Sequence, residues 1–212
     1  MVKRLIFDQD NTIMMWHDEY YYSLNKTFEH LNMNYNDMII NKIKEAVDNY
    51  EKEYNIFDKK SMKIIFEKYS KLELPDNFVD TWIHYLKECC PKEIDKKLVD
   101  TLEYLSSKYE LVILTNWFTE SQKGRLKNMG LLKYFKEVIG TDKVLNKPNK
   151  EAYLKACYPY NIDECIMIGD SINTDINGAL NIGMDAILFD YKNNYDGDLK
   201  NIKKFEELKN IL

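Results

Sequence analysis

Short runs of apolar residues recur along the chain, and each one ends abruptly at polar residues. Such runs are typical of strands buried on both faces of a parallel sheet, where each strand leads into a polar loop. The clearest runs cover residues 5–7, 111–114 and 165–168, and weaker candidates cover 186–189 and 138–140. The pattern therefore predicts four or five buried strands.

Apolar residues at helical spacing separate these runs. We expect helices over residues 96–107, 119–129, 150–158 and 174–181, with Thr119 as the N-cap of the second helix. The alternation of strands and helices predicts a parallel sheet in a doubly wound α/β domain.

The segment between residues 18 and 90 follows a different pattern, because it has no strand-like run and its apolar residues recur at helical spacing. Helices are expected over residues 18–31, 37–54, 59–69 and 76–87. We therefore expect a core domain of residues 1–14 and 91–212, and an inserted all-helical cap domain of residues 15–90 that lies over the strand ends.

Composition narrows the range of functions. The chain is 45% hydrophobic, which supplies a packed interior, and its net charge of -5 argues against nucleic-acid binding and favours a small substrate. There is no signal-peptide pattern and no apolar run of about 18 residues. We expect a cytoplasmic protein without membrane contact, monomeric or weakly dimeric, in which the four cysteines are free thiols.

Acidic residues gather where the predicted strands end. Asp8 and Asp10 follow the first strand, and Asp170 and Asp175 follow the strand at 165–168. Ligands of open α/β sheets bind outside the carboxyl ends of the strands, so we expect these acids to face one site. Close carboxylates repel one another, and hard oxygen donors suit Mg²⁺. The sequence therefore predicts a magnesium site.

Three further residues near strand ends suit phosphate chemistry. Lys147 is a candidate to neutralise a phosphoryl group or an attacking carboxylate, while the Thr115 hydroxyl and the Asn116 backbone amide are candidates to bind phosphate oxygens. Together with the acids they offer a nucleophile, a proton donor, a metal site and hydrogen-bond donors. Phosphoryl transfer requires this combination.

These residues form four short motifs in a fixed order along the chain. The motifs are Asp-Gln-Asp-Asn-Thr at 8–12, Thr115-Asn116, Lys147-Pro148, and Gly-Asp-Ser at 169–171 with Asp175. With them the chain resembles the haloacid dehalogenase (HAD) superfamily across its core domain. The resemblance implies a Rossmann-like core, a helical cap inserted after the first strand, and phosphatase activity.

The same resemblance implies roles for the acids. Asp8 is implied to be the nucleophile that attacks phosphorus, and Asp10 the acid that protonates the leaving oxygen and then the base that activates water. Magnesium is implied to be held by the Asp8 carboxylate, the Asp10 backbone carbonyl and Asp170, with Asp175 assisting. An acid at Asp10 favours phosphate over halide chemistry, since a halide needs no protonation.

The resemblance also implies that Lys147 stabilises negative charge and that Thr115 and Asn116 hold the phosphoryl oxygens. Two positions depart from the pattern of many sugar-phosphate members: Asn11 replaces a glycine and Met15 replaces an acid. Both departures argue against a sugar substrate. The alternatives are a phosphotransferase or phosphomutase acting on sugar phosphates, and a non-catalytic protein that binds phosphorylated metabolites.

Aromatic residues cluster where the first strand loop enters the predicted cap. Trp16, His17 and Tyr20 to Tyr22 either line the substrate cleft or pack within a cap helix, and packing is the favoured interpretation. The histidines lie singly and form no ligand spacing, so we expect structural roles for all three.

Overall fold

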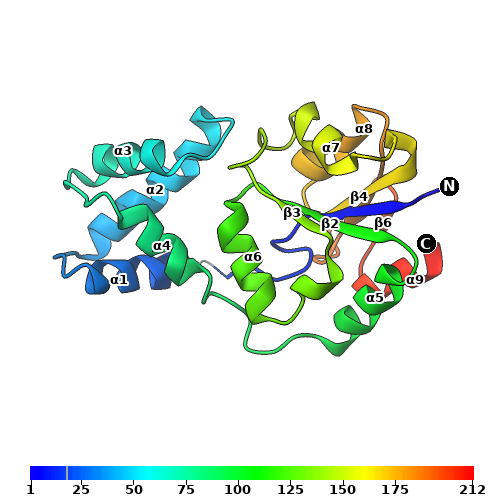
Figure 1. The fold of residues 1–212 in the computed structure, drawn as a ribbon, viewed down its shortest axis with the longest axis horizontal. Coiled ribbons are helices and arrows are strands. Elements are labelled where there is room, and N and C mark those ends of the chain that lie inside the picture. Colours follow the sequence, from blue (N-terminus) through cyan, green and yellow to red (C-terminus); the bar gives the residue numbers. More distant parts are fainter. Residues whose placement is uncertain (18) are drawn as a thin grey trace.

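The computed structural model describes residues 1–17 and 19–212. A six-stranded sheet lies inside the larger part of the molecule, beside the group of helices α1 to α4 (Figure 1). Every strand pair is parallel, and the order is β3-β2-β1-β4-β5-β6. The strands are β1 Arg4–Phe7, β2 Glu110–Leu114, β3 Glu137–Ile139, β4 Cys165–Gly169, β5 Asp185–Phe189 and β6 Asn201–Ile202. The order reverses at β1, so the switch point of this doubly wound sheet lies beside the first strand.

Helices cover both faces of the sheet. They are α5 Lys96–Ser106, α6 Thr119–Asn128, α7 Lys150–Cys157, α8 Gly178–Leu180 and α9 Leu208–Ile211, with 3₁₀ turns at Leu132–Tyr134, Ile162–Glu164 and Phe205–Glu207. In Figure 1, α7 and α8 lie on one face, and α5 and α9 lie on the other. Successive β1 residues face opposite layers: Leu5 and Phe7 join one apolar cluster, and Ile6 joins the other.

A four-helix unit interrupts the chain between β1 and α5. Its helices are α1 Tyr20–His30, α2 Asp37–Glu53, α3 Lys59–Ser70 and α4 Phe78–Leu86. Asn36 and Asp58 cap α2 and α3, because their side chains accept hydrogen bonds from the amides of Ile39 and Ser61. These bounds match the sequence prediction closely, and the predicted start of the first helix at Asp18 lies outside the described residues.

The four-helix unit is docked on the core by the loop after β2. Trp117 and Phe118 leave the sheet and join the apolar cluster of the four helices. Two backbone hydrogen bonds add to this contact, from the Phe57 amide to the Thr141 carbonyl (2.9 Å) and from the Asn146 amide to the Asn55 carbonyl (2.8 Å). The unit therefore sits beside the strand ends where the acids were predicted.

Two local predictions differ from the structure, and two short elements were not predicted. Phe118, and not Thr119, is the N-cap of α6; the Thr119 hydroxyl instead accepts a hydrogen bond from the Gly140 amide (3.0 Å). The helix predicted over 174–181 is a π-helical turn, Ile172–Asn177, followed by the short α8. β6 and α9 had no sequence signal, because they are too short for a periodic pattern.

The expectation of free cysteines is confirmed. All four are unpaired, and three of them, Cys89, Cys157 and Cys165, are buried. Over the described part of the chain, no helix has the length and apolar character that crossing a bilayer requires.

Candidate active site

Asp8 lies one residue beyond β1, at the carboxyl edge of the sheet. Its amide donates to the Ile168 carbonyl (2.9 Å), which continues the pairing with β4 and fixes the direction of the side chain. Only 13% of this side chain is exposed, and one carboxylate oxygen accepts a 2.6 Å hydrogen bond from Lys147 Nζ. The predicted nucleophile is therefore largely shielded and paired with a cation.

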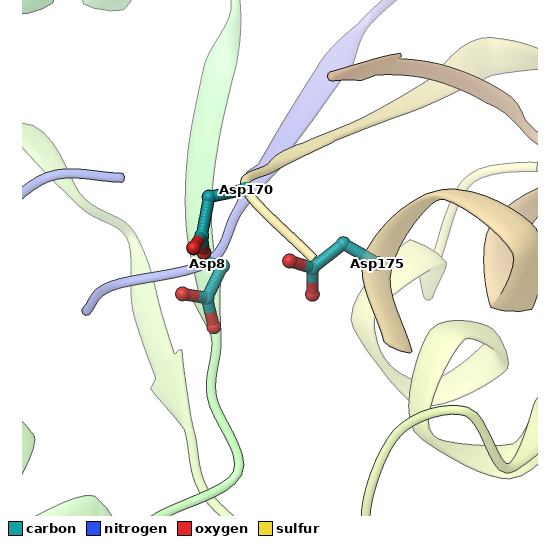
Figure 2. Close-up of side chains that lie close together, drawn as sticks. All are labelled: Asp8, Asp170 and Asp175. Carbon is teal, nitrogen blue, oxygen red and sulfur yellow. The ribbon is translucent and has the colours of Figure 1, made fainter. Parts of the chain in front are cut away.

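Asp170 and Asp175 converge on Asp8 (Figure 2). Carboxylate oxygens of the three residues all lie within 4.8 Å of one another. The π-helical turn brings Asp175 back toward its own strand, where its Oδ2 accepts from the Ser171 amide (3.0 Å). A Cβ on Gly169 would lie 2.3 Å from that same oxygen, so a glycine is required at the end of β4.

Lys147 connects two of the three carboxylates. Its side chain is 1% exposed, and Nζ donates to Asp8 Oδ1 (2.6 Å) and to Asp175 Oδ1 (2.7 Å). Asn116 holds the lysine backbone in place, since its Oδ1 accepts from the Lys147 amide (2.7 Å) and its Nδ2 donates to the Lys147 carbonyl (2.9 Å). The second and third sequence motifs therefore interlock through the Asn116 side chain, whereas sequence analysis had considered only its backbone amide.

Burial and mutual repulsion shape the charge of this cluster. Burial raises the pKa of Asp8 well above its usual value, and the Asp175 charge raises it further against the opposing effect of Lys147. Burial and the Asp175 charge also raise the pKa of Asp170, to about 6. Although burial lowers the pKa of Lys147, the Asp175 and Asp8 charges outweigh it and raise that pKa. One lysine thus faces three acids, and this excess of hard oxygen donors fits a divalent cation.

Asp10 lies outside this cluster and is held by residues of α6. One Asp10 oxygen accepts from Gln122 Nε2 (2.7 Å), and the other forms an ion pair with Arg125. The same Gln122 nitrogen donates to the Thr115 hydroxyl (2.9 Å), so the predicted acid and a predicted phosphate ligand share one support. Gln9, buried beneath them, donates to Gln122 Oε1 (3.1 Å).

Gln122 and Arg125 were missed by sequence analysis. A weak signal was present: two long polar side chains lie three residues apart in a helix with few apolar residues, so they share one face. Both are buried in the structure, with exposed fractions of 0% and 1%. Buried polar side chains on a helix next to strand ends are candidates for a functional site.

A cavity of about 340 Å³ opens over these groups and contains all seven predicted site residues. It is lined by Asp8, Asp10, Asn11, Trp16, Tyr20, Thr115, Asn116, Trp117, Lys147, Asp170, Ser171, Thr174 and Asp175. The Tyr20 ring lies 4.9 Å from that of Trp16 and 5.5 Å from that of Trp117, measured between centroids. Trp16 and Tyr20 thus both pack together and line the cleft, whereas Tyr21 and Tyr22 are exposed.

Asn11 adopts a left-handed backbone conformation in the loop after β1. Its φ is 61°, a value that glycine adopts freely and asparagine tolerates better than most residues. Its side chain also accepts from the Trp16 amide (3.2 Å). Asparagine at position 11 is therefore compatible with the backbone conformation of this loop.

Several known proteins are similar to this chain in sequence or in structure. A glyceraldehyde 3-phosphate phosphatase from Methanothermobacter thermautotrophicus is 28% identical over 69% of this chain, and a pyrimidine 5'-nucleotidase, PynA, from Streptococcus pneumoniae is 34% identical over 43%. The aligned parts span 63% and 40% of those two relatives. A magnesium-bound structure of the protein YfnB from Bacillus subtilis superposes with a TM-score of 0.76, at 22% identity, over 99% of this chain and 98% of that one. The family model described as haloacid dehalogenase-like hydrolase matches residues 5–189, and the chain therefore belongs to this family.

Proposed function

We propose that this protein is a magnesium-dependent phosphomonoester hydrolase that acts on a small phosphorylated metabolite through an aspartyl-phosphate on Asp8. The observation that carries the proposal is the cluster of Asp8, Asp170 and Asp175 around the buried Lys147, on the floor of the cavity. The relatives include a glyceraldehyde 3-phosphate phosphatase and a pyrimidine 5'-nucleotidase, which supports the same reaction.

The three clustered carboxylates fit Mg²⁺, because they offer several hard oxygen donors and carry a net negative charge. Asp8, Asp170 and the Asp10 backbone carbonyl would hold the ion, with Asp175 assisting. When bound, Mg²⁺ would neutralise charge on the transferring phosphoryl group.

The side chains divide the chemistry among them. An Asp8 oxygen attacks phosphorus, and the ester P–O bond breaks as the new bond forms. The leaving oxygen keeps the bond's electron pair and takes a proton from Asp10. Asp10 then accepts a proton from the water that attacks the aspartyl-phosphate, which releases inorganic phosphate and restores Asp8. Lys147 stabilises the negative charge, while the Thr115 hydroxyl and the Asn116 amide donate to phosphoryl oxygens.

We propose residues 1–14 and 91–212 as the core domain and residues 15–90 as the cap. Trp16 and Tyr20 reach the cavity from the cap side, and Trp117 meets them from the core. In this position the cap excludes bulk water from the phosphoryl group and contacts the leaving group.

Charge in the cavity favours a leaving group that is itself uncharged. Among the described residues that line the cavity, Lys147 is the sole cation, and it already pairs with two carboxylates. We therefore expect glycerol 3-phosphate to be hydrolysed with a kcat/KM about tenfold or more above that of 3-phosphoglycerate, which differs by one carboxylate. Steady-state phosphate release by both substrates measures this ratio, and a preference for 3-phosphoglycerate would contradict it.

Phosphate release from 4-nitrophenyl phosphate, with Mg²⁺ and with EDTA, tests the proposed function itself. Turnover is expected only with the metal. A native protein that binds Mg²⁺ but hydrolyses neither this ester nor a broad panel of metabolite phosphates would overturn the hydrolase assignment. Turnover of a sugar bisphosphate without phosphate release would instead identify a phosphotransferase.

Replacing Asp170 with Asn is expected to stabilise the metal-free protein at high pH. The Asp170 pKa is raised from 3.8 to about 6 in the folded state, so folding favours the protonated acid. The stability that this group contributes is complete below pH ~4 and is lost as pH rises through about 6. Because the side chain is partly exposed, we expect Asp170→Asn to gain about 1 to 2 kcal/mol at pH 8.

Denaturant unfolding in EDTA at pH 4 and pH 8 measures this effect, and the two proteins should be equally stable at pH 4. In excess Mg²⁺ the order should reverse, because only the native protein gains stability from the metal. If Mg²⁺ stabilised Asp170→Asn as much as it stabilises the native protein, Asp170 would not be a metal ligand.

A further inference from the structure

Arg125 is a buried cation that the proposed chemistry does not use. Its side chain is 1% exposed and is not part of the cavity lining, and its hydrogen bonds and ion pair go to Asp10, Cys89 and Gln122. We propose that Arg125 is a positioning residue that joins the Asp10 carboxylate to both segments that connect core and cap. The inference rests on the proposed function, since it assumes that Asp10 transfers protons.

Arg125 and Gln122 together hold the Asp10 carboxylate. Arg125 Nη1 forms the ion pair with one Asp10 oxygen and also donates to Gln122 Oε1 (3.1 Å), while Gln122 Nε2 binds the other Asp10 oxygen (2.7 Å). Arg125 and Gln122 therefore each hold one Asp10 oxygen, and they are hydrogen-bonded to each other. A carboxyl group held at two points keeps one orientation, which proton transfer to a bound ester requires.

Arg125 also contacts both connections between core and cap. Arg125 Nε donates to the Cys89 carbonyl (2.8 Å), shortly after α4 ends. On the other side the guanidinium carbon lies 5.0 Å from the centre of the Trp16 ring, shortly before α1 begins. The chain passes from core to cap near Trp16 and returns near Cys89. The Arg125 side chain thus contacts Asp10, the proposed proton donor, and both segments that connect core and cap.

The charge of Arg125 is maintained in this site. Burial lowers the pKa of the guanidinium, but the Asp10 charge and hydrogen bond outweigh burial, and the nearby Glu19 adds to the effect. A neutral side chain of similar length at position 125 would lose the ion pair, the bond to Cys89 and the contact with the Trp16 ring together. Asp10 would then be free to rotate and the cap connections free to shift.

Substrates with different leaving groups distinguish a role of Arg125 in positioning Asp10 from a role in stability alone. Nitrophenolate departs without protonation, whereas the more basic phenolate benefits from a proton donor. Because kcat/KM ends at the departure of the leaving group, it reports the acid step and not the later attack of water. We expect Arg125→Met to lower kcat/KM for phenyl phosphate about 100-fold and for 4-nitrophenyl phosphate less than about fivefold.

Arg4→Met is the matched control. Arg4 is also buried (3% exposed), pairs with Glu110 and donates to the Ala156 and Tyr158 carbonyls (2.6 Å each), at the opposite end of β1. It should lose stability as Arg125→Met does, and it should leave the ratio of the two kcat/KM values unchanged. Thermal unfolding of each variant confirms that the folded protein is being assayed.

Arg125→Lys serves as a second variant should Arg125→Met not fold. Lysine keeps the charge but cannot bind Asp10 and Cys89 at once, so a loss of about tenfold confined to phenyl phosphate is expected. Equal losses for both esters, or no loss for either, would overturn the inference and leave the hydrolase assignment standing. If the native protein hydrolyses neither these esters nor a broad panel of metabolite phosphates, the proposed function fails, and the role of Arg125 fails with it.

Discussion

Asp8→Asn is expected to lower kcat for phosphate release by about 10⁴-fold or more, with little change in fold. The amide has the shape of the carboxylate but cannot attack phosphorus, so the aspartyl-phosphate cannot form. Lys147 keeps its bond to Asp175 in this variant, which limits the structural effect. Phosphate release with saturating Mg²⁺, together with mass spectrometry of acid-quenched protein for a phosphorylated intermediate, measures the change.

Asp190→Asn is the matched control for this variant. Asp190 is buried (5% exposed) and follows β5 at the same edge of the sheet, but its carboxylate accepts from the amides of Asn194 and Tyr195 (3.1 Å each). We expect this change to cost about 1 kcal/mol of stability and to alter kcat less than about threefold. If Asp8→Asn retained activity comparable to that of Asp190→Asn, Asp8 would not be the nucleophile.

The sequence was sufficient to predict the residues that line the strand ends. Burial on both faces makes each central strand a continuous apolar run, so the first polar residue after the run marks the edge of the sheet. Asp8 and Asp170 follow adjacent parallel strands, and parallel register brings such residues together. Their proximity is therefore a consequence of pattern and topology alone.

The supports of these residues could not be predicted in the same way. The ion pair of Arg125 with Asp10 joins residues 115 positions apart, and no local periodicity reports such a contact. The turn that carries Asp175 depends on Gly169, where the absence of a side chain makes room for a carboxylate. Sequence patterns report which face of an element is buried, whereas these contacts depend on how distant elements meet.

The aromatic lining of the cavity is the least predictable feature, because it forms where the two parts of the chain meet. Trp117 follows a core strand yet belongs to the apolar cluster of the four-helix unit, and Tyr20 begins a helix of that unit yet lines the cavity. In the sequence, Trp117 and Tyr20 each look like ordinary apolar core residues. Only the docking of the two parts sets their rings 5.5 Å apart in the wall of the cavity.

Lys147→Met is expected to tighten Mg²⁺ binding while lowering kcat. Removing the lysine leaves three clustered carboxylates without their buried cation, so attraction for a divalent ion should rise about tenfold or more. Catalysis should fall about 10³-fold, because the charge that develops on the phosphoryl oxygens loses a fixed partner. Calorimetric titration with Mg²⁺ and phosphate-release assays measure the two effects.

The stability of Lys147→Met should depend on whether Mg²⁺ is bound. Without Mg²⁺, two buried acids lose their partner, and the free energy of unfolding at pH 7 should fall by about 3 kcal/mol; saturating Mg²⁺ should restore most of it. Lys59→Met is the control, since Lys59 pairs with Asp80 and Glu120 on the surface and should change neither quantity measurably. If Mg²⁺ affinity rises while kcat falls, Lys147 contacts the same carboxylates that bind the metal. A lysine that only stabilises the fold would not produce these opposite changes. If Lys147→Met weakened Mg²⁺ binding, the ion would have to bind away from the acids that the lysine contacts.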